Sequence, residues 1–191
     1  MLTPHTTITS GAFSSPVGIG LDRSGNLWVA DDDNDELYMF TSAQLTAGGS
    51  QSSTVTIGSA PLDAPEPLIF DKSGSMWVGN NVNGSNALAM KFTQNQLTMD
   101  GSPTPAVTLS PTTVTNTSAQ SLDGVGGLVL DKKGNLWVTN FTSDQRGSIA
   151  QFSNNDIGAD GTPQPTIFID SDAGGSNVFR PFFCAFGPKV P

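Results

Sequence analysis

The chain has 191 residues and a formal net charge of −9, and only 13% of its positions are charged. This acidity argues against binding of nucleic acids or anionic membrane surfaces, which need a basic surface. A single cysteine, Cys184, excludes an intrachain disulfide, and no apolar run approaches the roughly 20 residues of a membrane-spanning helix.

Short apolar or β-branched segments separated by turn residues predict strands from the N-terminus onward. Residues 3–9 are expected to form the fourth strand of a sheet, without a first, second or third strand before it. A four-strand unit then follows, with Ser42–Leu45 as one helical turn before its last strand. The four strands are expected at 16–22, 27–30, 37–41 and 54–58.

The same order of segments then recurs twice. The second unit is expected to have strands at 65–70, 76–78, 87–92 and 105–109, and the third at 125–130, 136–138, 148–152 and 165–169. A last strand is expected at 181–187, where Pro181 corresponds to Pro16 and the chain stops soon afterwards.

Each unit contains one copy of a ten-residue phrase in which every tryptophan of the chain lies. The three copies are Asp22–Asp31, Asp71–Asn80 and Asp131–Asn140, with Trp28, Trp77 and Trp137 at the same position. A fixed period of this length is typical of repeat architectures. We expect the three rings to fill the space between neighbouring units, because side chains this large dominate packing.

Tandem units of four short antiparallel strands predict an all-β fold, a β-propeller. Residues 1–191 then form a single, partial propeller with blades at about 16–58, 65–110 and 125–170. Strand 3–9 and strand 181–187 are the stray outer and inner strands of further blades. Since propellers have four to eight blades, we expect an incomplete ring, part of a larger one, and self-association of the isolated chain through its open blade faces.

The phrase Pro16-Val-Gly-Ile-Gly-Leu-Asp-Arg-Ser-Gly-Asn-Leu-Trp-Val-Ala-Asp31 resembles the NHL repeat. Its tryptophan, and the Phe-Thr-x-x-Gln-Leu run that begins at Phe92, resemble uncharacterised bacterial NHL-like propellers. More distantly, the chain is similar to gluconolactonase-like and virginiamycin-lyase-like propellers. The resemblance implies a propeller fold but no single function, because this fold hosts binding modules, lyases and lactonases.

One candidate binding site follows from the ends of the second strands. Asp31, Asn80 and Asn140 open the loops between second and third strands, which meet at one end of a propeller. Oxygen ligands suit Ca²⁺ or Mg²⁺, and the resemblance to the lactonase-like and lyase-like propellers implies a divalent cation near such a mouth. A purely structural role in the turns is the alternative, and we assign no metal ligands outside these three residues.

Other acidic residues are expected to be structural. Asp22, Asp71 and Asp131 begin the turns after the first strands and can accept hydrogen bonds from N–H groups two or three residues on. The acids between Asp32 and Glu36 occur in the first unit only, and we expect them to form a solvated loop.

Nothing in the sequence assembles a catalytic set. His5 is the only histidine, and it lies in the stray N-terminal strand. We therefore predict a non-catalytic propeller that binds a protein, peptide or glycan on one face, without a cofactor. The alternative is a Ca²⁺- or Mg²⁺-dependent lactonase-like or lyase-like enzyme. The N-terminus shows no signal peptide, and the sequence leaves the compartment open.

Overall fold

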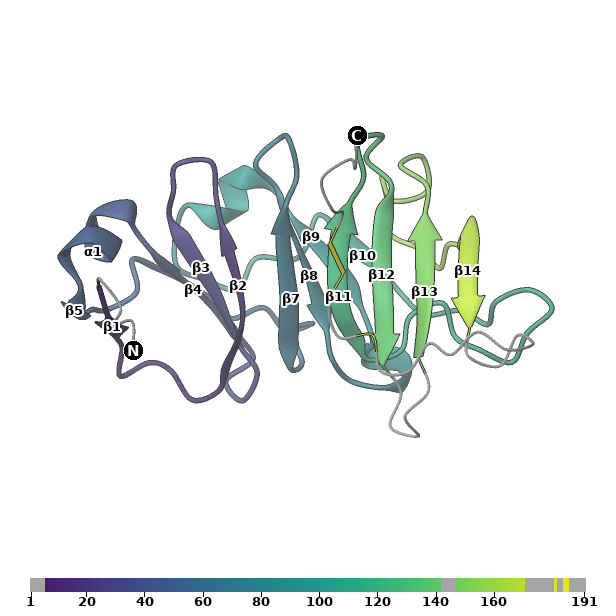
Figure 1. The fold of residues 1–191 in the computed structure, drawn as a ribbon, viewed down its shortest axis with the longest axis horizontal. Helices are drawn as coiled ribbons and strands as arrows, with labels where there is room; N and C mark the ends of the chain where they lie inside the picture. Colours follow the sequence, from purple (N-terminus) through teal and green to yellow (C-terminus); the bar gives the residue numbers. More distant parts are fainter. Residues whose placement is uncertain (1–5, 142–146, 171–180, 182–183, 186–191) are drawn as a thin grey trace, which may run out of the picture.

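The computed structural model describes residues 6–141, 147–170, 181, 184 and 185. Three sheets of four antiparallel strands stand side by side in chain order, as Figure 1 shows. Each sheet is built from consecutive strands, so each is one propeller blade. The predicted all-β propeller with an incomplete ring is confirmed, because the described residues form three blades and no closed ring.

The strands have nearly the bounds that the sequence predicts. Blade 1 consists of β2 (Pro16–Leu21), β3 (Leu27–Asp31), β4 (Glu36–Phe40) and β6 (Val55–Ile57). Blade 2 consists of β7 (Pro65–Phe70), β8 (Met76–Asn80), β9 (Ala89–Phe92) and β10 (Val107–Leu109). Blade 3 consists of β11 (Val125–Leu130), β12 (Leu136–Phe141), β13 (Gly147–Phe152) and β14 (Ile167–Asp170).

The repeated Phe-Thr-x-x-Gln run forms a short capped helix after the third strand. In blade 1 it is α1 (Ser42–Ala47), where the Thr41 and Gln44 side chains each bond the other residue's backbone N–H. Blade 2 has the same capping box on the 3₁₀ helix η2 (Gln94–Leu97), and a second 3₁₀ helix, η1 (Gly84–Asn86), precedes β9. Such reciprocal caps satisfy backbone donors that a helix start leaves open.

The turns between first and second strands are held by their aspartates. Asp22 accepts hydrogen bonds from the backbone N–H groups of Ser24 (2.8 Å) and Asn26 (3.0 Å), and Asp71 and Asp131 repeat the pattern. The donors lie two and four residues on, rather than two or three as expected. The turn glycine, Gly25 in blade 1, has a φ of +76°, which other residues rarely adopt.

Two of the three tryptophans fill the spaces between blades as predicted, whereas Trp137, on the outer face of blade 3, is partly exposed. Trp28 of blade 1 is 1% exposed and belongs to a buried cluster that contains Met76 and Met90 of blade 2. Trp77 is also 1% exposed, and it is clustered with Leu136 and Phe152 of blade 3. Most of the core therefore lies at the two blade interfaces, and a third buried cluster of Val29, Tyr38 and Phe40 lies on the outer face of blade 1, covered by Phe13.

A backbone contact on the outer side also joins neighbouring blades, and we call it the inter-blade clasp. The last strand of one blade meets an Asp-Gly pair in the connector of the next. Asp100 accepts a hydrogen bond from the N–H of Thr56 (2.7 Å), and Gly58 donates to the carbonyl of Gly101 (3.1 Å). The equivalent contacts join Asp160–Gly161 to Thr108–Ser110.

A two-stranded parallel pair before blade 1 has the same geometry. β1 (Ile8–Thr9) pairs with β5 (Gly49–Ser50), just as Ile57 pairs with Gly101 at the clasp. This equivalence supports our proposal that residues 3–9 are the outer strand of another blade, although residues 3–5 lie outside the described part. Of the expected strand 181–187, the described residues are Pro181, Cys184 and Ala185, and none of them is in a strand.

The outermost faces of the three-blade stack are more exposed than their inner equivalents. Ile19 on β2 is 71% exposed, whereas Leu68 and Leu128 at the same position of blades 2 and 3 are 4% exposed. On the opposite face, Ile169 on β14 is 40% exposed, whereas its equivalent Ile57 is fully buried. The apolar residues of an inner blade face are thus buried because a neighbouring blade covers them.

Candidate functional site

The three predicted binding residues lie at equivalent places but are buried. Asp31, Asn80 and Asn140 end the paired part of β3, β8 and β12, each opposite the first residue of the neighbouring strand. All three are fully buried. The structure therefore places them at the same end of the blades, beneath the surface.

Their polar atoms bond the loop that leads into the same blade. Asp31 accepts hydrogen bonds from the N–H groups of Ser14 (2.9 Å) and Ser15 (3.0 Å). Asn140 accepts one from the N–H of Asp123 (3.2 Å) and donates to the carbonyl of Ser121 (3.1 Å). These contacts fit the structural alternative, and a Ca²⁺ or Mg²⁺ role for the three residues stays a prediction.

Asn80 makes the same kind of contacts in blade 2. Its Oδ1 accepts from the N–H of Asp63 (3.3 Å), and its Nδ2 donates to the carbonyls of Pro61 (2.7 Å) and Asn86 (3.0 Å). Two loops are thereby tied to the end of β8 through one side chain.

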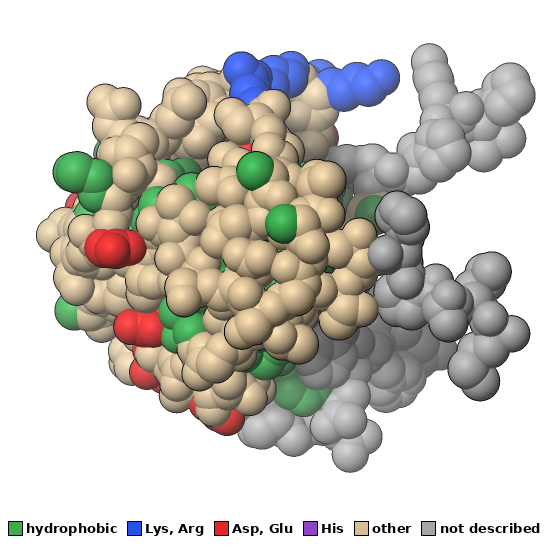
Figure 2. Space-filling model, turned by 90° about the vertical axis from the view of Figure 1, so that its left-hand side faces the viewer, with side chains coloured by type: hydrophobic (Ala, Val, Ile, Leu, Met, Phe, Trp, Pro, Cys, Tyr) green, Lys and Arg blue, Asp and Glu red, His purple; other side chains and the backbone are tan. Residues whose placement is uncertain are grey.

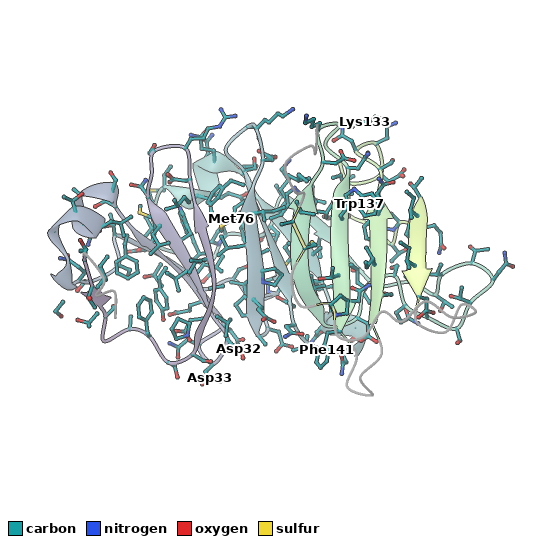
Figure 3. The ribbon with its side chains drawn as sticks, viewed as in Figure 1. Asp32, Asp33, Met76, Lys133, Trp137 and Phe141 are labelled. Atoms are coloured by element: carbon teal, nitrogen blue, oxygen red, sulfur yellow. The ribbon has the colours of Figure 1, made fainter. Side chains whose placement is uncertain are left out.

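Acidic side chains supply the accessible surface at this end, which Figure 3 marks with Asp32 and Asp33. Burial and the charges of neighbouring acids, Asp33 first, raise the pKa of Asp32 above its ordinary value. Among the residues that the structure describes, no three His, Cys, Asp or Glu side chains converge as metal ligands would.

Glu66 is an acid that sequence reasoning did not single out. It lies on β7 between two prolines, is 9% exposed, and accepts a hydrogen bond from the Asn81 side chain. Burial raises its pKa, against the effect of the Asn81 contact. Glu66 also borders a cavity of about 380 Å³ between the first strands of the blades, which Cys184 reaches.

Neither His5 nor Cys184 supports a catalytic site. His5 lies outside the described residues, so no catalytic role can be built on it. Cys184 is partly buried, and burial raises the pKa of its thiol to about 11. A thiol with that pKa is protonated at neutral pH and is a poor nucleophile.

The opposite end of the blades gathers cations, although the chain as a whole is acidic. Arg23, Lys72 and Lys132 each follow the aspartate of a turn, and we call them the cation row. Arg23 donates to the carbonyl of Lys72, and Lys72 donates to the carbonyl of Lys132 at 3.4 Å. Figure 2 shows Lys and Arg side chains together at this end.

The signal for this row was present in the repeat but easily overlooked. The cations stand 49 and 60 residues apart in the chain, as the partners of the two contacts show. Only alignment of the turns brings them to one position. Folding then places the three cations side by side, while most acids of the loops between second and third strands lie at the opposite end of the blades.

Beside this row, a cleft of about 550 Å³ opens between blade 2 and blade 3, and we call it the turn-end cleft. Its apolar lining comes from Leu130, Ile157 and Trp77, whereas Phe70 borders it at the end of β7 with its ring turned toward Trp28 of blade 1. Lysines and small polar side chains complete the lining: Lys72, Lys91, Lys132, Lys133, Ser73 and Asn154. Figure 3 labels Lys133 at this end.

The two aspartates of the cleft already have partners within the protein. Asp71 pairs with Lys91 at 2.9 Å, and although burial acts to raise its pKa, hydrogen bonds from Ser73 and Lys91 lower it. Burial likewise acts to raise the pKa of Asp131, but hydrogen bonds from Asn135, the Trp137 indole and the Lys133 backbone outweigh it and lower the pKa. Both side chains are therefore ionised, and their oxygens already accept hydrogen bonds within the protein.

The lysines at the rim differ in this respect. Lys72, Lys132 and Lys133 are exposed and form no ion pair within the described part of the chain. The turn-end cleft thus combines an apolar base with an excess of positive charge, four lysines against two aspartates, in a protein whose net charge is −9.

Comparisons by sequence add no family. No protein-family model matches the chain, and no curated protein matches it. The likeness to NHL repeats therefore remains a resemblance. No helix among the described residues is long and apolar enough to cross a membrane.

Solved structures share the fold at low identity. Hydrazine synthase of Kuenenia stuttgartiensis matches with a TM-score of 0.56 and 11% identity, over 81% of this chain and 37% of that one. An extracellular domain assigned to a hybrid two-component system of B. thetaiotaomicron matches at 0.53 and 15%, over 90% of this chain and 20% of that one. A streptogramin B lyase matches at 0.48 and 16%, over 83% and 40%.

This chain spans only a fifth to two fifths of those proteins. At such identities the first two matches support a shared fold alone, and the third, with its lower TM-score, supports no conclusion. The chain is similar to these proteins in architecture, and its three sheets are blades of a β-propeller.

Proposed function

We propose that this chain is a binding part of a propeller, without a catalytic step, and that it holds its ligand in the turn-end cleft. The observation that carries the proposal is the cleft itself. Its volume of about 550 Å³ lies within the roughly 300–1,000 Å³ of small-molecule sites, and it has an apolar base with polar groups around it.

The position of the cleft supports a stable site. It lies between two blades that share a buried core around Trp77, so its walls are fixed by packing. The turns that form its rim are held by the aspartate contacts described above. A preformed site loses little conformational entropy when a ligand binds.

Gly158 offers a direct test because it lines the cleft and an added Cβ there would meet nothing within 4 Å. A Gly158→Phe variant should fold normally and fill the cleft. Gly11→Phe is the matched control, since Gly11 has the same free space and does not line the cleft. Binding is measured by ligand-observed NMR with a fragment mixture of neutral and charged compounds.

The expected result is that fragments bind the natural chain and Gly11→Phe but not Gly158→Phe. If no fragment binds, or if Gly158→Phe binds them all unchanged, the cleft is not the site.

The alternative, a Ca²⁺- or Mg²⁺-dependent lactonase or lyase, would use the opposite end of the blades. There the oxygens of Asp31, Asn80 and Asn140 already accept backbone N–H groups. A thermal titration with each cation tests this alternative: a millimolar-range stabilisation that an Asn80→Ala, Asn140→Ala variant loses would favour it.

A further inference from the structure

The charge pattern around the turn-end cleft points to a particular kind of ligand. Within the described residues its lining has four lysines and two aspartates, and one lysine, Lys91, is paired with Asp71. Lys91 also lies over the ring of Trp77, 5.7 Å from its centre. Lys91 is therefore a fixed part of the wall, and Asp71 neutralises its positive charge.

The remaining three lysines face solvent at the rim. Lys72 donates to a backbone carbonyl, which leaves its charge without a carboxylate, and Lys132 and Lys133 stand on the adjacent turn. Three ammonium groups around one opening repel each other, and an anion placed among them relieves that repulsion. An ionised acceptor also forms shorter and stronger hydrogen bonds with ammonium donors than a neutral acceptor does.

The base of the cleft needs something other than a bare ion. Leu130 is half-buried and lines the cleft, where Trp77 and Ile157 are 1% and 6% exposed. A small inorganic anion would leave this apolar surface wet. A ligand with an apolar body would cover it, which is favourable by about 25 cal/mol for each Å² removed from water.

Other anions fit less well. A long polyanion would run past the cleft onto a protein with 17 acidic and 8 basic residues, and it would be repelled there. A peptide strand would need an open sheet edge for backbone pairing, whereas this cleft is lined by turns and by the space between two blades.

We infer that the turn-end cleft binds a small organic carboxylate with an apolar body, its carboxylate among Lys72, Lys132 and Lys133 and its body over Leu130 and Ile157. This inference rests on the proposed function and names the ligand class of the same site. Ser73 and Asn154 at the rim provide hydrogen bonds for further polar groups of such a ligand.

A matched pair of probes separates charge from shape: 2-naphthoate and its neutral isostere 2-naphthamide. Both are titrated into the ¹⁵N-labelled 191-residue chain, and amide shifts give the site and the Kd. Naphthoate should shift the amides of residues 130–134 and 154–158 and bind at least roughly tenfold more tightly than naphthamide. Added salt should weaken naphthoate alone.

Lysine variants then test the role of the rim. Lys133→Ala should weaken naphthoate by roughly threefold to tenfold and leave naphthamide unchanged. Arg23→Ala is the control, because it removes one positive charge from the cation row at a place that does not line the cleft. Melting temperatures of both variants check that these exposed substitutions leave the fold intact.

The outcomes are distinct. If both probes bind equally and Gly158→Phe abolishes both, the cleft is a ligand site but the carboxylate inference is wrong. If naphthoate binds but Gly158→Phe does not change it, or if neither probe binds at 5 mM, the inference is also wrong. The fragment screen with Gly158→Phe and Gly11→Phe then decides on the proposed function by itself.

Discussion

The choice between aspartate and asparagine at the end of each second strand follows from the partners that the side chain meets. Asp31 faces two N–H donors, so an acceptor with two oxygens satisfies both. Asn80 and Asn140 each face one N–H donor and at least one carbonyl, so they need an NH₂ group as well. The sequence shows aspartate in one repeat and asparagine in the other two, and only the fold explains the difference.

Exchanging the two residue types should therefore destabilise the protein at both places. Asn140→Asp puts a carboxylate against the carbonyl of Ser121 in a fully buried position, and Asp31→Asn turns an NH₂ toward a backbone N–H. We expect each to lower the free energy of unfolding by about 1–3 kcal/mol, the cost of a buried group without its partner. Urea denaturation without metal measures this, and full stability of both variants would refute the structural role.

Glu66 predicts a dependence of stability on pH. Its pKa is raised in the folded protein, so the folded state holds the proton more tightly than the unfolded chain does. The stability that this group contributes is complete below its unfolded pKa of about 4.3 and is lost as the pH rises through the folded value.

The variant Glu66→Gln fixes a neutral side chain and should escape that loss. Its melting temperature should exceed that of the natural protein at pH 7.5, and the difference should shrink or vanish at pH 4. Thermal unfolding followed by circular dichroism at both pH values measures this. A difference that does not change with pH would mean that Glu66 ionises as freely in the folded protein as in the unfolded chain.

Among the elements, the inter-blade clasp explains a repeated motif of the connectors before the last strands. The Gly-x-Pro-x-Pro runs that begin at Gly101 and Gly161 follow the aspartates that bond the preceding blade. Each blade is thus joined to its neighbour twice, by an apolar core and by these outer hydrogen bonds.

Loss of one clasp should loosen a blade pair without unfolding it. Asp160→Ala removes the acceptor for the N–H of Thr108, which is expected to cost about 1 kcal/mol. Hydrogen exchange should show faster exchange at Thr108 and its neighbours in β10, and little change at Thr56 in β6. Asp100→Ala should give the reverse pattern, which makes the two variants controls for each other.

Strand positions could be predicted well because the turn chemistry repeats. An Asp-x-x-Gly turn followed by an apolar run occurs in each blade, and the observed bounds of β7 and β11 equal the expected ones. The parallel pairing of β5 with β1 could not be predicted, because Gly49–Ser50 has no strand propensity and owes its pairing to its neighbour in space.

The site was harder to predict for the same reason. Its residues belong to different repeats, and a cleft between blades depends on how two sheets pack. Asp31, Asn80 and Asn140 lie at equivalent ends of their strands, but no pattern of residue types could show that they are buried. The cation row required the turns to be compared with one another.

At the scale of the whole molecule, the open blade faces bear on association. Val17, Ile19 and Leu21 on one outer face and Ile167 and Ile169 on the other are all at least 40% exposed. Between blades, the equivalents of these faces pack against each other. A head-to-tail contact between copies of the chain would cover these exposed residues as neighbouring blades cover their equivalents.

We therefore expect the isolated 191-residue chain to self-associate with rising concentration. Ile19→Lys should block one face and Ile169→Lys the other, so each variant alone should be mainly monomeric. A mixture of the two should form dimers and nothing larger, because each pair retains one good contact. Sedimentation velocity measures this, and a natural chain that stays monomeric at 100 μM would contradict the expectation.

The unequal surroundings of the three indoles make the protein its own optical probe. Trp28 and Trp77 are 1% exposed, whereas Trp137 lies partly exposed on the last blade. Iodide should thus quench one emission component out of three, the one at longest wavelength. Covering of the outer face of blade 3 should shift that component to the blue, so fluorescence can report blade-to-blade contact at concentrations far below those that sedimentation requires.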